Sequence, residues 1–179
     1  MRRFKRVFSA VMVLALMFSL SASALAAEYD LTIGDVAVSA DASGQYVTQT
    51  NGVQNFKDET EIVITSNGVE TSNTISIESS EEATAEVTIS DVNIVVEDES
   101  AIYIKEGSDV VITVEGSNSV ANTGEYMGAL GDYAITKSAA VHVQDANLTI
   151  AGATGAEQDS LEVRAGTSFE HGGWCCHWL

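Results

Sequence analysis

Residues 85–94 read AEVTISDVNI and residues 109–118 read DVVITVEGSN, two stretches built on the same pattern. In both, aliphatic residues alternate with polar ones, and Asp, Gly or Asn follows within a few positions. Alternation with a period of two is typical of β-strands that have one buried face. No segment after the first 26 residues keeps a helical periodicity, so the sequence predicts an all-β protein. Nine such runs are found, at 61–65, 74–77, 87–89, 92–94, 102–104, 112–114, 141–143, 148–150 and 161–163.

The spacing of the runs predicts how the strands are arranged. Ile62, Val87 and Ile112 follow one another at intervals of 25 residues, and Leu148 follows 36 residues later, which is one interval plus an 11-residue insertion. A fixed period between 20 and 50 residues indicates a repeat architecture. We therefore expect a right-handed parallel β-helix (β-solenoid) of about 25 residues per coil. A β-sandwich with coincidental spacing is the alternative.

In such a β-helix, residues at equivalent positions stack in columns. Ile62, Val87, Ile112 and Leu148 are expected to form an inward column. An outward column is expected at 63, 88, 113 and 149. Asn93 and Asn118, also 25 residues apart, are expected to stack their amides at a corner.

The first 26 residues have the pattern of a secretory signal peptide. A cationic start is followed by an apolar stretch, residues 7–20, and by Ala24-Leu25-Ala26, which fits a cleavage site. The expected organisation is a signal peptide at 1–26, an N-terminal cap or lead-in at 27–58, the solenoid at 59–168 and an aberrant tail at 169–179. The mature protein is thus expected to be secreted. It would be extracellular or associated with the cell surface, with no membrane association after cleavage.

Cleavage would leave four cations against 26 acidic residues, a formal net charge of −22. A surface this acidic repels nucleic acid and anionic lipid, so neither is an expected partner. The charge could attract Ca²⁺, for which Glu97, Asp98 and Glu99 are candidate ligands. High negative charge could instead serve only to keep a β-rich protein from associating edge to edge. No cofactor other than Ca²⁺ is indicated.

The last residues differ in composition from the rest. Both tryptophans and both cysteines of the chain lie between Trp174 and Trp178. The adjacent Cys175 and Cys176 do not have the spacing of a structural zinc site. Read one base later, the codons for this segment would give Gly, two small residues, Ile or Thr, and Gly. We therefore expect the tail to be out of frame, so that the chain is a truncated piece of a longer repeat protein.

Several stretches resemble a known family. Residues 71–77 (TSNTISI), 85–94, 101–105 (AIYIK) and 109–118 are similar to secreted parallel β-helix proteins of Gram-positive anaerobic bacteria. These are described as carbohydrate-binding-domain proteins of the cell surface. The resemblance implies a β-helical fold and a polysaccharide or other cell-surface component as partner. It rests on the repeat pattern and on no catalytic motif.

Candidate sugar-binding residues combine an exposed aromatic ring with polar neighbours. Tyr103 is expected on an outward column, with His142 as its neighbour one coil later and Ser76 as its equivalent one coil earlier. The predicted insertion adds Tyr126 and Tyr133, because inserted loops on a rigid scaffold commonly carry binding surfaces. These two tyrosines could equally cover the apolar core.

The sequence contains no pattern that indicates an enzyme. It has no Ser-His-Asp set, no metal-binding His pair and no phosphate-binding loop, so we expect no catalysis. The function expected is non-catalytic binding of extracellular or cell-wall polysaccharide. The alternatives are a structural or adhesive segment of a larger cell-surface protein and, third, a degenerate polysaccharide lyase. Neither the glycan nor the oligomeric state can be read from the sequence.

Overall fold

A computed structural model describes residues 26–58, 60–124, 139–153 and 158–165. These residues form strands joined by turns, and they contain no helix. Accordingly, no helix in this part of the chain has the length and apolar character needed to cross a membrane. Each of the nine runs picked out by alternation overlaps a strand.

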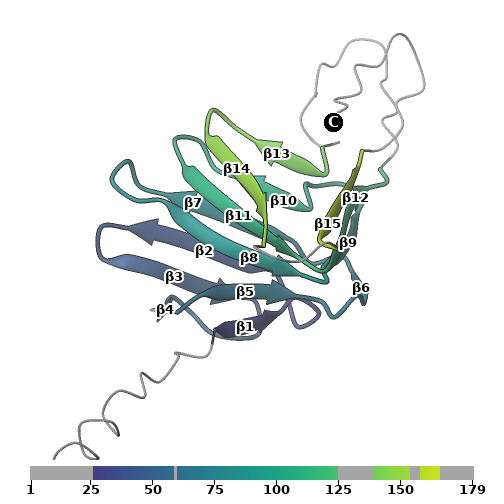
Figure 1. The fold of residues 1–179 in the computed structure, drawn as a ribbon, viewed down its shortest axis with the longest axis horizontal. Helices are drawn as coiled ribbons and strands as arrows, with labels where there is room; N and C mark the ends of the chain where they lie inside the picture. Colours follow the sequence, from purple (N-terminus) through teal and green to yellow (C-terminus); the bar gives the residue numbers. More distant parts are fainter. Residues whose placement is uncertain (1–25, 59, 125–138, 154–157, 166–179) are drawn as a thin grey trace, which may run out of the picture.

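The strands form three sheets, all visible in Figure 1. The five-stranded sheet has the order β1 (Ala27–Asp30), β5 (Ile62–Thr65), β8 (Ala85–Ser90), β11 (Asp109–Glu115), β14 (Asn147–Gly152). The six-stranded sheet has the order β13 (Val141–Val143), β10 (Ile102–Ile104), β7 (Ile75–Ser79), β2 (Val36–Asp41), β3 (Gly44–Gln49), β4 (Phe56–Asp58). The four-stranded sheet has the order β15 (Ser160–Arg164), β12 (Ser117–Asn122), β9 (Asn93–Val96), β6 (Glu70–Thr71).

The predicted right-handed parallel β-helix is wrong as the fold class. The five- and four-stranded sheets are parallel, but the six-stranded sheet is mixed, because β3 runs antiparallel to β2 and β4 antiparallel to β3. The interval between paired strands also varies: Ala27 pairs with Ile62, 35 positions away, and Val63 with Thr88, 25 away. The fold is a three-sheet arrangement of strands without a uniform coil.

The antiparallel strands come from the predicted lead-in segment. A tight turn joins β2 to β3, with the Ser43 amide donating a hydrogen bond to Asp41 Oδ1 at 2.7 Å. Gly44 has φ 136°, a conformation that a side chain would disfavour. Asp41 therefore pairs with Gly44 across a short hairpin, and residues 36–58 become three adjacent strands of the six-stranded sheet.

The predicted inward column is only partly present. Val87 and Ile112 are register partners and both are buried, but the next partner of Ile112 is Ile150, whereas Leu148 pairs with Val110. The prediction placed Leu148 two residues out of register. A slip of two residues keeps every side chain on its own face, so alternation alone could not detect it.

The outward column shows the same slip. Val63, Thr88 and Thr113 are aligned as expected, but Thr113 pairs with Ala151, and Thr149 pairs with Val111. Thr149, the last member of the predicted outward column, is therefore the residue whose register was predicted wrongly.

The predicted amide stack is also absent, because Asn93 pairs with Ser119 rather than with Asn118. Asn118 is instead buried below the corner between two sheets, where its Oδ1 accepts a hydrogen bond from the Val92 amide at 2.9 Å. Its Nδ2 donates to the carbonyl oxygen of Glu115 at 2.7 Å. Partner residues are 25 positions apart in β8 and β11 but 26 apart in β9 and β12, so Asn118 lies level with Val92 and not with Asn93.

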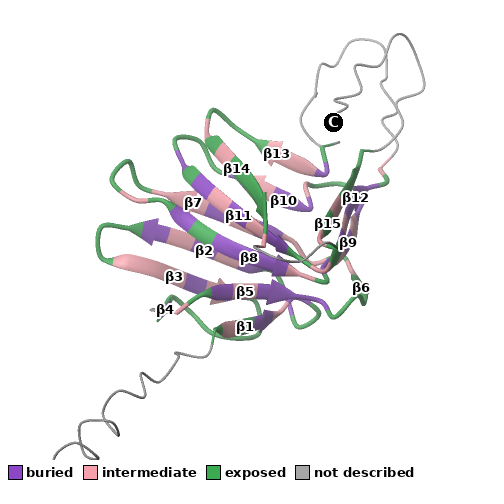
Figure 2. Cartoon of the chain, in the orientation of Figure 1, coloured by how far each residue is buried: buried purple, intermediate pink, exposed green. Residues whose placement is uncertain are grey.

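The buried aliphatic side chains form one cluster enclosed by the three sheets. Figure 2 shows the buried positions concentrated in the inner strands, whereas β14 and β15 are mostly exposed and β13 is mostly intermediate. Among the described strands these three are the last in their sheets, so within this part of the chain their aliphatic residues are covered from one side. Val143, Ile150 and Val163 are consequently 39 %, 48 % and 50 % exposed.

Candidate binding face

The outer face of the six-stranded sheet brings together residues from four distant parts of the chain. Register pairs Ala37 with Ser76, Ser76 with Tyr103, and Tyr103 with His142. Parallel pairing in register puts all four side chains in one row across β2, β7, β10 and β13. Each is partly exposed, as expected for the solvent-facing side of a half-buried sheet.

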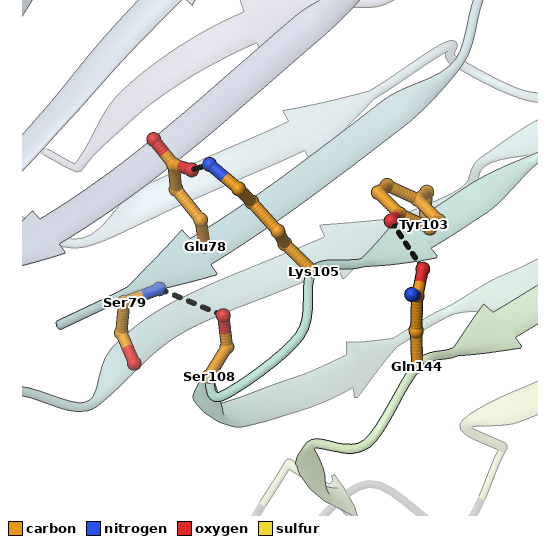
Figure 3. A network of polar contacts seen from close by, with 6 residues as sticks. All are labelled: Glu78, Ser79, Tyr103, Lys105, Ser108 and Gln144. Carbon is orange, nitrogen blue, oxygen red and sulfur yellow. Dashed lines mark hydrogen bonds and ion pairs between the residues drawn. The ribbon is translucent and has the colours of Figure 1, made fainter. Parts of the chain in front are cut away.

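Tyr103 and His142 are in contact, as the sequence predicted. Their ring centroids lie 5.3 Å apart with an angle of 72° between the planes, an edge-to-face arrangement. The Tyr103 hydroxyl donates a hydrogen bond to Oε1 of Gln144 at 2.9 Å (Figure 3). The Tyr103 ring is thus contacted by His142 of β13, and its hydroxyl is held by Gln144, which follows that strand.

A second row of polar side chains lies two residues further along the same strands. Lys105 follows β10 and forms an ion pair with Glu78 of β7 (Figure 3). Both side chains are exposed, at 61 % and 45 %. The pKa of Lys105 lies above its ordinary value because its ammonium donates a hydrogen bond to the Glu78 carboxylate and is attracted by its charge.

The turn that carries Lys105 is anchored to the neighbouring strand. Gly107 has φ 77°, a left-handed conformation that favours glycine. The buried Ser108 hydroxyl accepts a hydrogen bond from the Ser79 amide at 3.0 Å, and the Ser79 hydroxyl accepts one from the Asp109 amide at 2.8 Å. These bonds tie the turn to β7, so Lys105 is presented from a fixed backbone.

A shallow depression of about 400 Å³ lies beside Tyr103 and Lys105 on this face. Its floor is formed by small side chains of β2 and β7, among them Ala37, Ser39 and Ser76. Hydroxyl groups, one side-chain amide and the Tyr103 ring line the depression, and most of its lining residues are uncharged. We refer to the outer side of β2, β7, β10 and β13, with this depression, as the tyrosine face.

A larger hollow of about 910 Å³ lies over the four-stranded sheet. Asn93, Ser119, Glu162 and Arg164 are among the residues that line it, and its described lining contains no aromatic ring. Arg164 donates to both carboxylate oxygens of Glu162, at 2.8 and 2.7 Å. The tyrosine face is the stronger candidate because it joins a ring to hydrogen-bonding groups.

Not all of the predicted site residues can be placed. Tyr126 and Tyr133 lie outside the described residues, as does the tail at 169–179. Glu97, Asp98 and Glu99 form an exposed bend after β9. Within the described ranges, no group of three or more His, Cys, Asp or Glu side chains is arranged to hold a metal ion. A Ca²⁺ site at residues 97–99 stays a prediction from sequence.

Sequence reasoning missed the second polar row of this face. Glu78, Lys105 and Gln144 were not predicted as sugar-binding residues, although each lies two positions beyond a residue of the first row. Glu78 lies in β7 with Ser76, so the period of two was an available signal for this residue. Lys105 and Gln144 follow the ends of β10 and β13, where that period no longer fixes the direction of a side chain. Comparison of the chain with family models, with curated proteins and with solved structures finds no match.

Proposed function

We propose that this chain is a secreted, non-catalytic protein that binds extracellular or cell-wall polysaccharide through the tyrosine face. The observation that carries the proposal is the Tyr103 ring at the rim of a depression lined by hydroxyl and amide groups. An aromatic ring packs against the apolar face of a sugar, while polar side chains exchange hydrogen bonds with its hydroxyls. Ser39, Ser76 and Thr48 supply such groups in the lining of the depression.

The chemistry of the depression favours binding over catalysis. Glycoside hydrolysis normally uses two carboxyl groups on either side of the scissile bond. Glu78 is the only carboxylate in the described lining of the depression, and it is already paired with Lys105. The degenerate polysaccharide lyase named as a third possibility would be revived by release of unsaturated products from an acidic polymer.

One observation favours the alternative of a structural segment in a larger cell-surface protein. Val143, Ile150 and Val163 face the interior side of the last strands and are 39–50 % exposed. A further layer of strands, from this or another chain, would bury them. In that case the chain would show no affinity for any polysaccharide.

The test is retention on a panel of insoluble polysaccharides and on a glycan array. We expect Tyr103→Ala to weaken binding by about tenfold or more, as for an aromatic residue that packs directly against a ligand. Tyr103→Phe keeps the ring, loses the bond to Gln144, and should lose less. Phe56→Ala is the matched control, because Phe56 is a 51 % exposed ring of the same sheet that does not line the depression.

Tyr126→Ala and Tyr133→Ala complete the series, since the sequence predicts that these tyrosines belong to the same surface. Failure of the native chain to bind any polysaccharide would favour the structural alternative. Equal binding by Tyr103→Ala and the native chain would show that the ligand lies elsewhere.

A further inference from the structure

We infer that the polysaccharide bound at the tyrosine face is uncharged, an inference that rests on the function proposed above. Among the described residues, ten line the depression, and only Glu78 and Lys105 of these carry a charge. These two form an ion pair with each other, so the described lining is electrically neutral. The remaining groups are hydroxyls, an amide, a phenol and aliphatic carbons, which suit sugar hydroxyls and C–H faces.

An acidic polysaccharide meets two obstacles here. The chain carries a formal net charge of −18, so a polymer with a carboxylate on each sugar is repelled before it reaches the face. Lys105 is the only cation in the part of the lining that the structure describes, and its ammonium already donates to Glu78. A ligand carboxylate would have to displace Glu78 and would then lie beside it, two like charges at close range.

A cationic polysaccharide would behave differently from a neutral one. Its amino groups are attracted by the acidic surface as a whole, and this attraction is screened by salt. Such binding does not need the Tyr103 ring or the depression. Salt dependence and sensitivity to Tyr103→Ala therefore separate a ligand held at the face from a polymer held by net charge.

The experiment compares four polymers by affinity electrophoresis: a neutral glucan, a neutral galactomannan, polygalacturonate and a polymer of glucosamine. At least one neutral polymer should bind at both 20 mM and 500 mM NaCl, with affinities within about twofold, because no net charge is neutralised on binding. Polygalacturonate should not bind at 20 mM NaCl. Any binding of the glucosamine polymer should fall by about tenfold at the higher salt and be unchanged by Tyr103→Ala.

Stronger binding of polygalacturonate than of either neutral polymer would overturn the inference while leaving the proposed function intact. A tenfold loss of neutral-polymer binding at high salt would also overturn it. If none of the four polymers binds in a Tyr103-dependent way, the proposed function itself is wrong. The two failures are therefore distinguishable.

A pair of matched variants tests whether Glu78 excludes acidic sugars. Glu78→Gln removes the carboxylate that pairs with Lys105, so the Lys105 ammonium can bind a ligand carboxylate. This variant should therefore gain measurable retention of polygalacturonate. Glu162→Gln makes the same change of one charge and frees Arg164 on the four-stranded sheet, remote from the depression. It should gain none. An equal gain by both variants would assign the effect to net charge and overturn the role given to Glu78.

Discussion

Ile112 and Ile150 are register partners in adjacent strands, yet Ile112 is 1 % exposed and Ile150 is 48 % exposed. Both occupy the same position in the alternating pattern and face the same interior. The difference is that β11 has a neighbour on each side, β8 and β14, whereas β14 has one neighbour among the described strands. Alternation decides which way a side chain points, but burial in this fold is supplied by the next strand in the sheet.

The largest expected difference between these regions is in the cost of losing an aliphatic side chain. Ile112→Ala should lower the free energy of unfolding by about 2–5 kcal/mol, because it leaves a cavity among fully buried residues. Ile150→Ala should cost about 1 kcal/mol or less, because half of its side chain is already in water. Urea-unfolding midpoints with unchanged slopes measure both values. Similar losses for the two variants would mean that another layer covers Ile150.

A smaller contrast is expected between two asparagines. Asn118 is 2 % exposed and satisfies the Val92 amide and the Glu115 carbonyl. Asn118→Ala should therefore cost about 1–3 kcal/mol, since it leaves buried backbone groups without partners. The exposed side-chain amide of Asn93 donates a long bond to the Gly68 carbonyl at 3.3 Å, so Asn93→Ala should change the free energy of unfolding by no more than about 0.5 kcal/mol. The same unfolding assay checks the pair, and an equal loss at both positions would contradict the corner geometry.

The smallest contrast concerns two carboxylates. Asp58 is 5 % exposed; burial raises its pKa, but hydrogen bonds from Thr60 and Tyr29 outweigh the burial and hold the pKa below its ordinary value. A lowered folded-state pKa means that this carboxylate stabilises the fold above the unfolded pKa of about 4. That contribution should disappear as the pH falls through the folded pKa. The pKa of Glu162 is also lowered, by its hydrogen bond from Arg164, but the pair is exposed and screened.

Unfolding free energies measured from pH 7 down to pH 3 test this contrast. Asp58→Asn should flatten the acid side of the stability profile, and Glu162→Gln should leave it nearly unchanged. A profile that Asp58→Asn leaves as steep as the native one would show that other carboxylates determine the acid sensitivity.

Nine of the fifteen strands in the described residues could be located from the sequence, but the winding of the chain could not. Alternation located β8 and β11 because each strand places its aliphatic residues on one face. It did not reveal that residues 36–58 double back as antiparallel strands. Asp41, Ser43 and Gly44 are also compatible with an ordinary surface turn, and the spacing between repeats does not cover this segment. The two-residue slip of Leu148 was invisible for a related reason, since it changes no side-chain direction.

The candidate site, likewise, could be predicted only in part. Tyr103 and His142 could be matched because equivalent positions in two strands become neighbours once the strands pair. The pairing of Lys105 with Glu78 could not be derived, because Lys105 lies in the turn after its strand and depends on how that turn is anchored. Tyr126 and Tyr133 lie outside the described residues, and their part in the site stays a prediction.

The hairpin of β2 and β3, which β4 extends, also affects the order in which the strands are expected to fold. Asp41 and Gly44 meet across a turn of two residues, whereas the paired strands of the parallel ladders are at least 23 positions apart. Closing a short loop loses less chain entropy and is faster than closing a long one. We expect this hairpin to fold first and to offer the free edge of β2 to β7, which then recruits β10. Amide protons of β2 and β3 should accordingly gain protection before those of β14 in pulsed hydrogen exchange. Structure would then grow from β2 and β3 toward β14, which is also the order in which these strands are synthesised.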